Sequence, residues 1–141
     1  MKTFILIFSI VLANTTAGNA QCGKKIVLTA SETIYLDSAG TVKRTASEKS
    51  VVQINPSEII INVNDEHKTT CIIKSTTCNW KIPYKQGKTV IKAVFSKDAE
   101  NKNVSFDIEG KDGKITLLFK MEERPDEIIK VVLNKFEEEK G

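Results

Sequence analysis

From residue 25 onward, short runs rich in Val, Ile, Thr and Phe are separated by clusters of Asp, Gly, Pro, Asn and Ser. Within most runs apolar and polar residues alternate with a period of two, which places one set of side chains on each face of a strand. Turn residues at near-regular intervals are typical of antiparallel strands in a barrel or sandwich. Nine segments are predicted to be strands: 25–36, 41–46, 49–55, 58–64, 69–77, 88–96, 103–110, 113–122 and 127–136.

The turns between these segments predict which residues face each other, because opposed residues in an antiparallel hairpin have a constant sum of residue numbers. The Asp-Gly pair at 112–113 is a strong two-residue hairpin turn, and further turns are predicted at 56–57, 98–101 and 124–126. The predicted apolar pairs are Phe106 with Phe119, Ile108 with Leu117, Phe95 with Val104, Met121 with Ile129, Ile54 with Ile59 and Val52 with Ile61. One apolar face therefore continues across four neighbouring strands, and a slip of one residue would turn it out to water.

The segment 127–136 also fits a helix. Its apolar residues form a helical stripe, and the Pro-Asp-Glu sequence at 125–127 is a good helix start. Its β-branched residues and its apolar register with the preceding segment favour a strand. We therefore predict a strand here, with a helix as the alternative.

A meander of eight or nine strands with one apolar face has edges that are best removed by closure. We predict an all-β fold in which an antiparallel meander of about eight to nine strands closes into a barrel. At about eight strands, the interior of such a barrel is packed with side chains or holds one small ligand.

Residues 1–20 predict export. Lys2 precedes an unbroken apolar run at 4–13, and small residues lead up to Ala20, which is the layout of a cleavable signal peptide. The run is shorter than the roughly 20 apolar residues that span a bilayer, so no transmembrane segment is expected. We predict cleavage after Ala20 and a single secreted or periplasmic domain at 21–141, close to the commonest size for one domain.

The balance of basic and acidic residues argues against some classes of partner. The chain has 21 Lys and Arg residues and 18 Asp and Glu residues, and since Lys2 is the single charge in the predicted signal peptide, 20 basic and 18 acidic residues remain after cleavage. Both signs are scattered along the strands. This balance provides no basic surface for nucleic acid or an anionic membrane, so neither is expected as a partner, and we expect a monomer.

Three cysteines follow the predicted cleavage site: Cys22, Cys71 and Cys78. In an oxidising compartment a pair is expected to form a disulfide. Cys71 and Cys78 are the nearest pair, although their odd spacing requires a bulge or bend in the strand. Cys22 lies where a lipoprotein carries its acylated cysteine, but Gln21 stands where such signals have a small residue. Cys22 is therefore expected to be a free thiol or the partner of another cysteine rather than a lipid anchor.

The predicted architecture resembles the lipocalin-like (calycin-type) barrels, specifically the small exported bacterial proteins of that type with no assigned activity. The resemblance covers the opening strand at 26–36, the stretch TCNWKIPYKQGKTVIKAVFS at 77–96, and the ending at 129–138. It implies a closed barrel with a ligand site inside. The Gly-x-Trp that opens true lipocalins is missing, because Gly23 is followed by two lysines and the single tryptophan is Trp80.

No catalytic set is recognisable in the sequence. His67 is the single histidine and lies in a polar turn, and the cysteine spacing matches no zinc-binding pattern. The carboxylate pairs at 65–66, 122–123 and 137–139 lie at turns or near the end of the chain, whereas a glycosidase needs two carboxyl groups roughly 5 to 10 Å apart across a cleft. We expect no enzymatic activity, no metal and no cofactor.

Aromatic residues are the candidates for a ligand site. The irregular segment 78–84 contains Trp80 and Tyr84, whose flat faces accept apolar ligands while their polar tips orient polar groups. The alternative, which we favour for Trp80, is that it closes one end of the barrel as core, since a buried tryptophan contributes roughly 150–250 Å² of burial. The remaining aromatic candidates are Phe95, Phe106 and Phe119.

Glu32 and Arg44 are the charged candidates. The register of the first hairpin makes them diagonal neighbours on the apolar face, where they would hold the head group of a ligand. The alternative, which we favour, is that this irregular hairpin twists away from the barrel and leaves both side chains in water.

Together these features predict an exported, non-enzymatic, lipocalin-like protein that binds a small, largely apolar ligand in the barrel. The alternative is a barrel with a solid interior that acts as a protein-interaction module in the cell envelope, with a protein partner and no small ligand.

Overall fold

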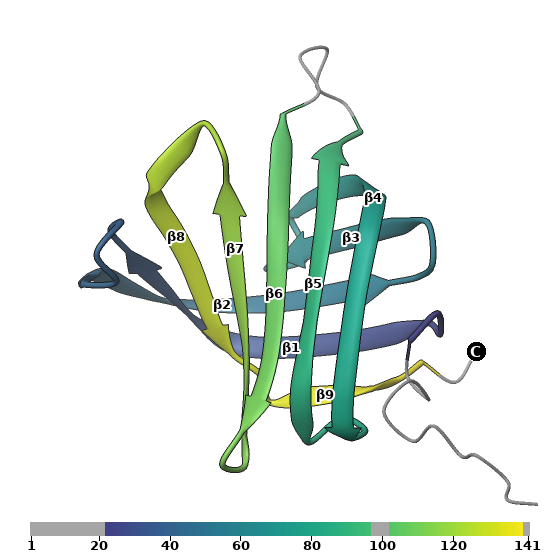
Figure 1. The fold of residues 1–141 in the computed structure, drawn as a ribbon. Coiled ribbons are helices and arrows are strands. Elements are labelled where there is room, and N and C mark those ends of the chain that lie inside the picture. Colours follow the sequence, from purple (N-terminus) through teal and green to yellow (C-terminus); the bar gives the residue numbers. More distant parts are fainter. Residues whose placement is uncertain (1–21, 97–101, 140–141) are drawn as a thin grey trace, which may run out of the picture.

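The fold is all-β. The computed structural model describes residues 22–96 and 102–139, and every regular element in these ranges is a strand (Figure 1). The predicted signal peptide and its cleavage site lie outside the described residues. The strands are β1 (Ile26–Leu36), β2 (Val42–Ile54), β3 (Glu58–Val63), β4 (His67–Ile82), β5 (Gln86–Phe95), β6 (Asn103–Lys111), β7 (Lys114–Met121), β8 (Arg124–Val132) and β9 (Lys135–Glu138). The described ranges contain no helix that is long and apolar enough to cross a membrane.

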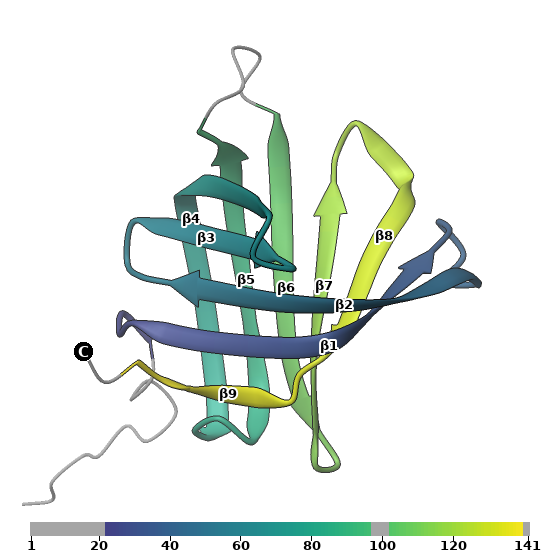
Figure 2. The same cartoon turned by 180° about the vertical axis from the view of Figure 1, so that it is seen from behind.

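Eight of these strands form a closed meander. From β2 through β8, consecutive strands pair antiparallel, and β1 closes the barrel by pairing with β2 on one side and β8 on the other. β9 is an additional strand that pairs with the first part of β1. β4 to β8 run side by side as one wall, and β1, β2, β3 and β9 cross it to form the other (Figures 1 and 2). The predicted closed antiparallel meander is confirmed.

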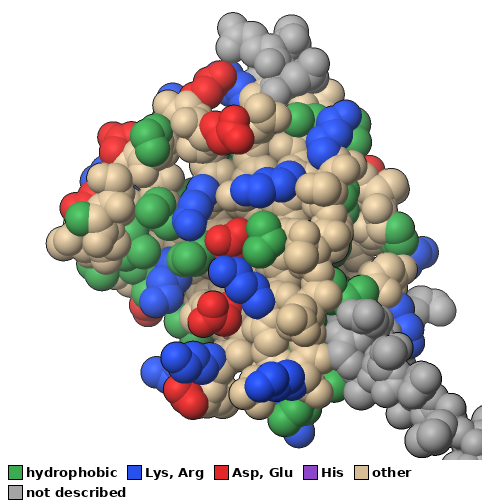
Figure 3. Space-filling view, in the orientation of Figure 1, with side chains coloured by type: hydrophobic (Ala, Val, Ile, Leu, Met, Phe, Trp, Pro, Cys, Tyr) green, Lys and Arg blue, Asp and Glu red, His purple; other side chains and the backbone are tan. Residues whose placement is uncertain are grey.

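Alternation along the strands separates the core from the surface. In β6, Val104, Phe106 and Ile108 are buried, because successive side chains of a strand point to opposite faces. Asp107 lies between them on the outer face and forms an ion pair with Lys120, at 3.7 Å. Figure 3 shows basic and acidic side chains interspersed over this outer wall, so this face carries no large patch of one charge.

Two hairpins have the register that their turns predict. Phe106 faces Phe119 across the turn at 112–113, and Val52 faces Ile61. In both hairpins a short turn leaves little freedom for slippage, so local turn chemistry and the apolar pattern agree.

The registers predicted for the two other hairpins are wrong by two residues. Ala93, not Phe95, faces Val104. In the β7–β8 hairpin, β8 begins at Arg124, which pairs with Met121, so the turn is shorter than predicted. The next pair, Lys120 with Ile128, is out of step with this one, which marks an irregularity in β8. A shift of two residues keeps each side chain on its predicted face. The residues predicted to face the interior therefore do so, although their cross-strand partners differ from the prediction.

Strand boundaries differ from the prediction mainly in three places. The strand predicted at 69–77 is longer, because β4 continues to Ile82, so most of the segment predicted to be irregular, 78–84, is strand. The segments predicted at 41–46 and 49–55 form one continuous strand, β2. The segment 127–136 is strand, as predicted, but it is divided between β8 and β9. At the break the Asn134 N–H donates to the Thr29 carbonyl, so the chain leaves the β7–β8 hairpin and continues along β1.

The disulfide joins Cys22 to Cys78, so the predicted Cys71–Cys78 pair is wrong. Cys71 and Cys78 lie on the same strand, β4. Their separation in sequence corresponds to roughly 23 Å of extended chain, far more than the ~4–7 Å between the Cα atoms of a disulfide. Cys22 reaches Cys78 from the segment before β1, with 6.3 Å between the Cα atoms, and Cys71 is a buried free thiol.

Candidate functional site

The barrel contains a partly open cavity of about 250 Å³, to which all eight barrel strands contribute side chains. Most of the lining is apolar. The aliphatic part consists of Val52, Ile61, Val63, Leu117, Ile129 and Val131.

Three phenylalanines form the aromatic part of the lining. Phe119 lies between the other two, with ring centroids 5.0 Å from Phe106 and 6.3 Å from Phe95. All three line the cavity. The structure therefore brings together the phenylalanines that the strand pattern singled out, and they form one wall of the cavity from β5, β6 and β7.

The cavity has a polar end where β1 and β2 meet. Thr33 and Tyr35 from β1 and Glu48 and Ser50 from β2 line it. The Tyr35 hydroxyl donates to the Glu48 carboxylate, at 3.2 Å from Oε1 and 3.3 Å from Oε2. Burial and the neighbouring Glu48 charge raise the pKa of Tyr35, while Arg44 opposes this shift.

Glu32 and Arg44 do not form a charged pair in the cavity, and both are exposed, as the favoured alternative predicted. An irregularity between Tyr35 and Leu36 shifts the register, so that Glu32 pairs with Ser47 and is exposed. Arg44 pairs with Tyr35, and its guanidinium lies 3.8 Å from the centroid of the Tyr35 ring. Arg44 is itself exposed, at the outer side of the polar end.

Tyr35 and Glu48 were not among the residues predicted for the site. The available signal was the alternation of Glu48, Ser50, Val52 and Ile54 within one strand. It was missed because the sequence divides into two apparent segments around residue 48, and because the irregularity in β1 cannot be seen in the pattern.

Thr33 is the most unusual polar residue of the cavity. Its side chain is 3% exposed, and its Oγ1 has no hydrogen-bond partner among the described residues. Buried hydroxyl groups are normally paired, because leaving one unpaired costs roughly 1–3 kcal/mol. A partner supplied by a ligand would remove this cost.

Trp80 lies at the other end of the barrel and does not line the cavity. It is fully buried, its Nε1 donates to Thr89 Oγ1 at 2.7 Å, and its ring lies 5.4 Å from that of Phe136. Tyr84 also packs on Phe136, with ring centroids 5.1 Å apart. These two aromatics are part of the core that closes this end, so the structure does not bring them to the phenylalanines.

Two glycines make room for the indole. Gly87 and Gly110 face each other on β5 and β6. A Cβ atom at Gly110 would lie 2.7 Å from Trp80 Cζ3 and 2.5 Å from the Lys85 carbonyl oxygen. The absence of side chains at this pair therefore allows the indole to close the barrel end.

A second, smaller cavity of about 180 Å³ lies beside the disulfide. Cys22 and Cys78 line it together with Ile54, Ile91 and Phe136. The Thr89 hydroxyl accepts a hydrogen bond from Trp80 Nε1 and donates one to Cys78 Sγ, at 3.5 Å. The Thr89 hydroxyl of this cavity is thus paired, in contrast to the unpaired Thr33 hydroxyl of the larger cavity.

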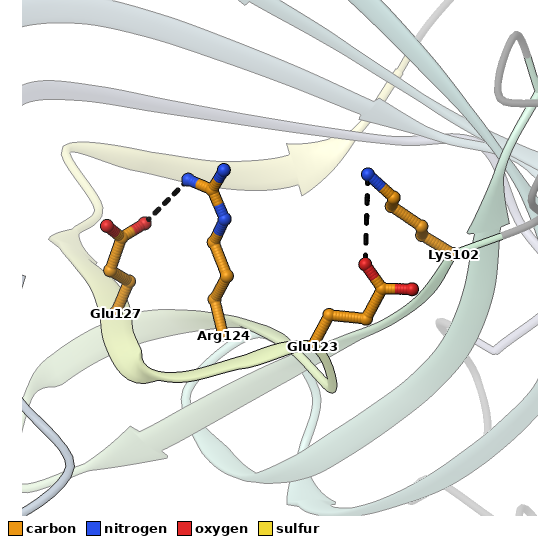
Figure 4. Close-up of polar contacts among 4 residues, drawn as sticks. All are labelled: Lys102, Glu123, Arg124 and Glu127. Atoms are coloured by element: carbon orange, nitrogen blue, oxygen red, sulfur yellow. Dashed lines mark hydrogen bonds and ion pairs between the residues drawn. The ribbon is translucent and has the colours of Figure 1, made fainter.

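Two ion pairs lie near the turn between β7 and β8. Lys102 lies 3.7 Å from Glu123, and Arg124 lies 3.4 Å from Glu127 (Figure 4). Exposed pairs of this kind contribute little to stability. The residues that the structure describes contain no group of three or more His, Cys, Asp or Glu side chains that could hold a metal ion.

In comparisons with known proteins, no family model matches the chain, and neither a curated protein nor a solved structure matches it. The fold and the site define a class by themselves. The protein is a small closed antiparallel β-barrel with an apolar internal cavity and one polar end.

Proposed function

We propose that the protein is an exported, non-enzymatic, lipocalin-like protein that binds a small, largely apolar molecule in the barrel. The observation that carries the proposal is the apolar cavity of about 250 Å³ within the core. Protein interiors are normally close-packed, and larger side chains that fill a cavity commonly stabilise a protein. A chain that keeps an aromatic-lined cavity gives up this stability, and ligand binding accounts for the loss.

Export rests on two observations of different kinds. The sequence of residues 1–20 has the layout of a cleavable signal peptide. The disulfide between Cys22 and Cys78 is typical of proteins in oxidising compartments, and it engages the thiol that a lipid anchor would need. The intact mass of the exported protein should equal that of 21–141 without acyl chains, and an acylated Cys22 would contradict the proposal.

The lipocalin-like assignment is supported by the closed eight-stranded meander, whose consecutive strands are neighbours throughout. In barrels of this size the interior has room for one small ligand. The competing proposal, an interaction module of the cell envelope, requires a solid interior, and the cavity argues against it.

The test is a fluorescence titration with the neutral apolar dye N-phenyl-1-naphthylamine. Val131 is buried and lines the cavity, whereas its neighbour Val132 is exposed on the outer face. We expect wild-type protein to bind the dye, Val131→Phe to lose binding because the new ring fills the cavity, and Val132→Phe to keep it. Binding that survives Val131→Phe in a folded variant, or no binding by the wild type, would reject the proposal in favour of the interaction module.

A further inference from the structure

The polar end of the cavity distinguishes between kinds of apolar ligand. We propose, on the basis of the proposed function, that the ligand is an amphiphile whose polar end is a hydrogen-bond donor without negative charge, a hydroxyl or an ammonium group. The Glu48 carboxylate and the Thr33 hydroxyl hold this group, while the apolar part of the ligand lies among the phenylalanines.

The charge of the cavity supports this choice. Glu48 is the single acidic or basic residue in the cavity lining, within the part of the chain that the structure describes. Arg44 is the basic group that faces this end, but it is exposed and stacks on the Tyr35 ring. A carboxylate head group would therefore bring a second negative charge beside Glu48, whereas an ammonium group would form a charge-assisted hydrogen bond with it.

Hydrogen-bonding capacity supports the same choice. A carboxylate can accept about four hydrogen bonds, and in this cavity the Tyr35 hydroxyl is the one side chain described as donating to Glu48. Thr33 Oγ1 is buried without a partner in the described part of the protein, and as a hydroxyl it can accept as well as donate. The polar end thus offers more acceptors than the protein uses, which suits a ligand that donates.

The strand register allows one head group to reach both residues. Thr33 pairs with Ala46, and Glu48 is two residues further along β2 on the same face. Thr33 and Glu48 are therefore diagonal neighbours, at a separation of roughly 7–8 Å that is typical of such pairs. Both side chains line the cavity, so a hydroxyl or ammonium group placed between them can contact both.

Isothermal titration calorimetry with a matched series tests the head group: octylamine, 1-octanol and octanoate share one chain and differ in charge and donor capacity. At pH 7 we expect octylamine to bind wild-type protein at least about tenfold more tightly than octanoate, the ratio for one charge-assisted hydrogen bond. We expect 1-octanol to bind between the two.

Two conservative variants assign the effect to residues. Glu48→Gln keeps the shape and removes the charge, so the preference for octylamine should fall to within about threefold of octanoate. Thr33→Val removes the hydroxyl at nearly constant volume and should weaken 1-octanol by about fivefold, in the range of one hydrogen bond. Glu32→Gln, an exposed residue on the same strand, is the matched control and should leave all three affinities unchanged. Thermal melting of each variant checks that it is folded.

The outcomes separate this inference from the proposed function. Octanoate binding as tightly as octylamine, or a preference that persists in folded Glu48→Gln, would overturn the head-group assignment and leave the apolar cavity as the ligand site. Failure of all three compounds and of the neutral dye to bind would overturn both proposals.

Discussion

Cys71 shows how the barrel interior affects an ionisable group. Burial raises the pKa of the Cys71 thiol from 9.0 to about 11, so the folded protein holds this proton more tightly than the unfolded chain does. The resulting contribution to stability is complete below pH 9 and is lost as the pH rises from about 9 to about 11. Between pH 8 and pH 11, the free energy of unfolding of wild-type protein should fall by roughly 2 kcal/mol more than that of Cys71→Ala. Urea denaturation of both proteins at the two pH values measures this difference, and parallel losses would contradict it.

At the scale of single residues, the sequence predicts burial better than it predicts partners. Phe95, Phe106 and Phe119 could be assigned to the inner face because alternation within a strand is local. Tyr35 and Glu48 could not be assigned, because their meeting depends on an irregularity in β1 that shifts the pairing with β2. The bond between Cys22 and Cys78 joins residues far apart in sequence, and spacing alone does not reveal such a pair.

The β6–β7 hairpin is the element whose register can be tested most directly. Phe106 is 1% exposed and its ring lies 5.0 Å from that of Phe119, so Phe106→Ala should lower the free energy of unfolding by about 3–5 kcal/mol. Lys120→Ala, on the outer face of the same hairpin, removes a partly exposed ion pair with Asp107 and should change the free energy of unfolding by less than about 1 kcal/mol. Urea denaturation of both variants provides the measurement. Equal losses would mean that the two faces have been assigned incorrectly.

Among the hairpins, the quality of the prediction follows how clearly the sequence marks the turn. The two-residue turn at 112–113 fixes its register, and Phe106 faces Phe119 as predicted. The turn into β8 is shorter than predicted, since Arg124 already pairs with Met121. The strand then accommodates Pro125 through an irregularity, a feature at which proline is tolerated in sheets. The errors are of two residues, so the inner face is preserved while the neighbours change.

For the molecule as a whole, the disulfide should be a main determinant of stability. Cys22 and Cys78 are separated by 56 residues, and on the chain-entropy account closing a loop of this length stabilises the fold by roughly 4 kcal/mol. The double variant Cys22→Ser/Cys78→Ser should unfold at a correspondingly lower urea concentration, and wild-type protein treated with a reductant should behave in the same way. An unchanged midpoint in both experiments would show that the bond does not constrain the unfolded chain.

Closure of the barrel could be predicted, whereas its cavity could not. A meander with one apolar face has strong reasons to close, and β1 does pair with both β2 and β8. The volume left inside depends on how side chains from all eight barrel strands fit together. Trp80 illustrates the difference, because its position at the closed end depends on two facing glycines, Gly87 and Gly110.

The central claim is that the larger cavity holds an apolar ligand, and methyl NMR spectroscopy with 1-octanol tests it most directly. We expect saturable shifts of the methyl groups of Leu117, Ile129 and Val131, which line the cavity. The methyl groups of Ile82 and Val132, which are exposed, should stay unchanged. Shifts confined to exposed methyl groups, or no saturable shifts at all, would contradict the account.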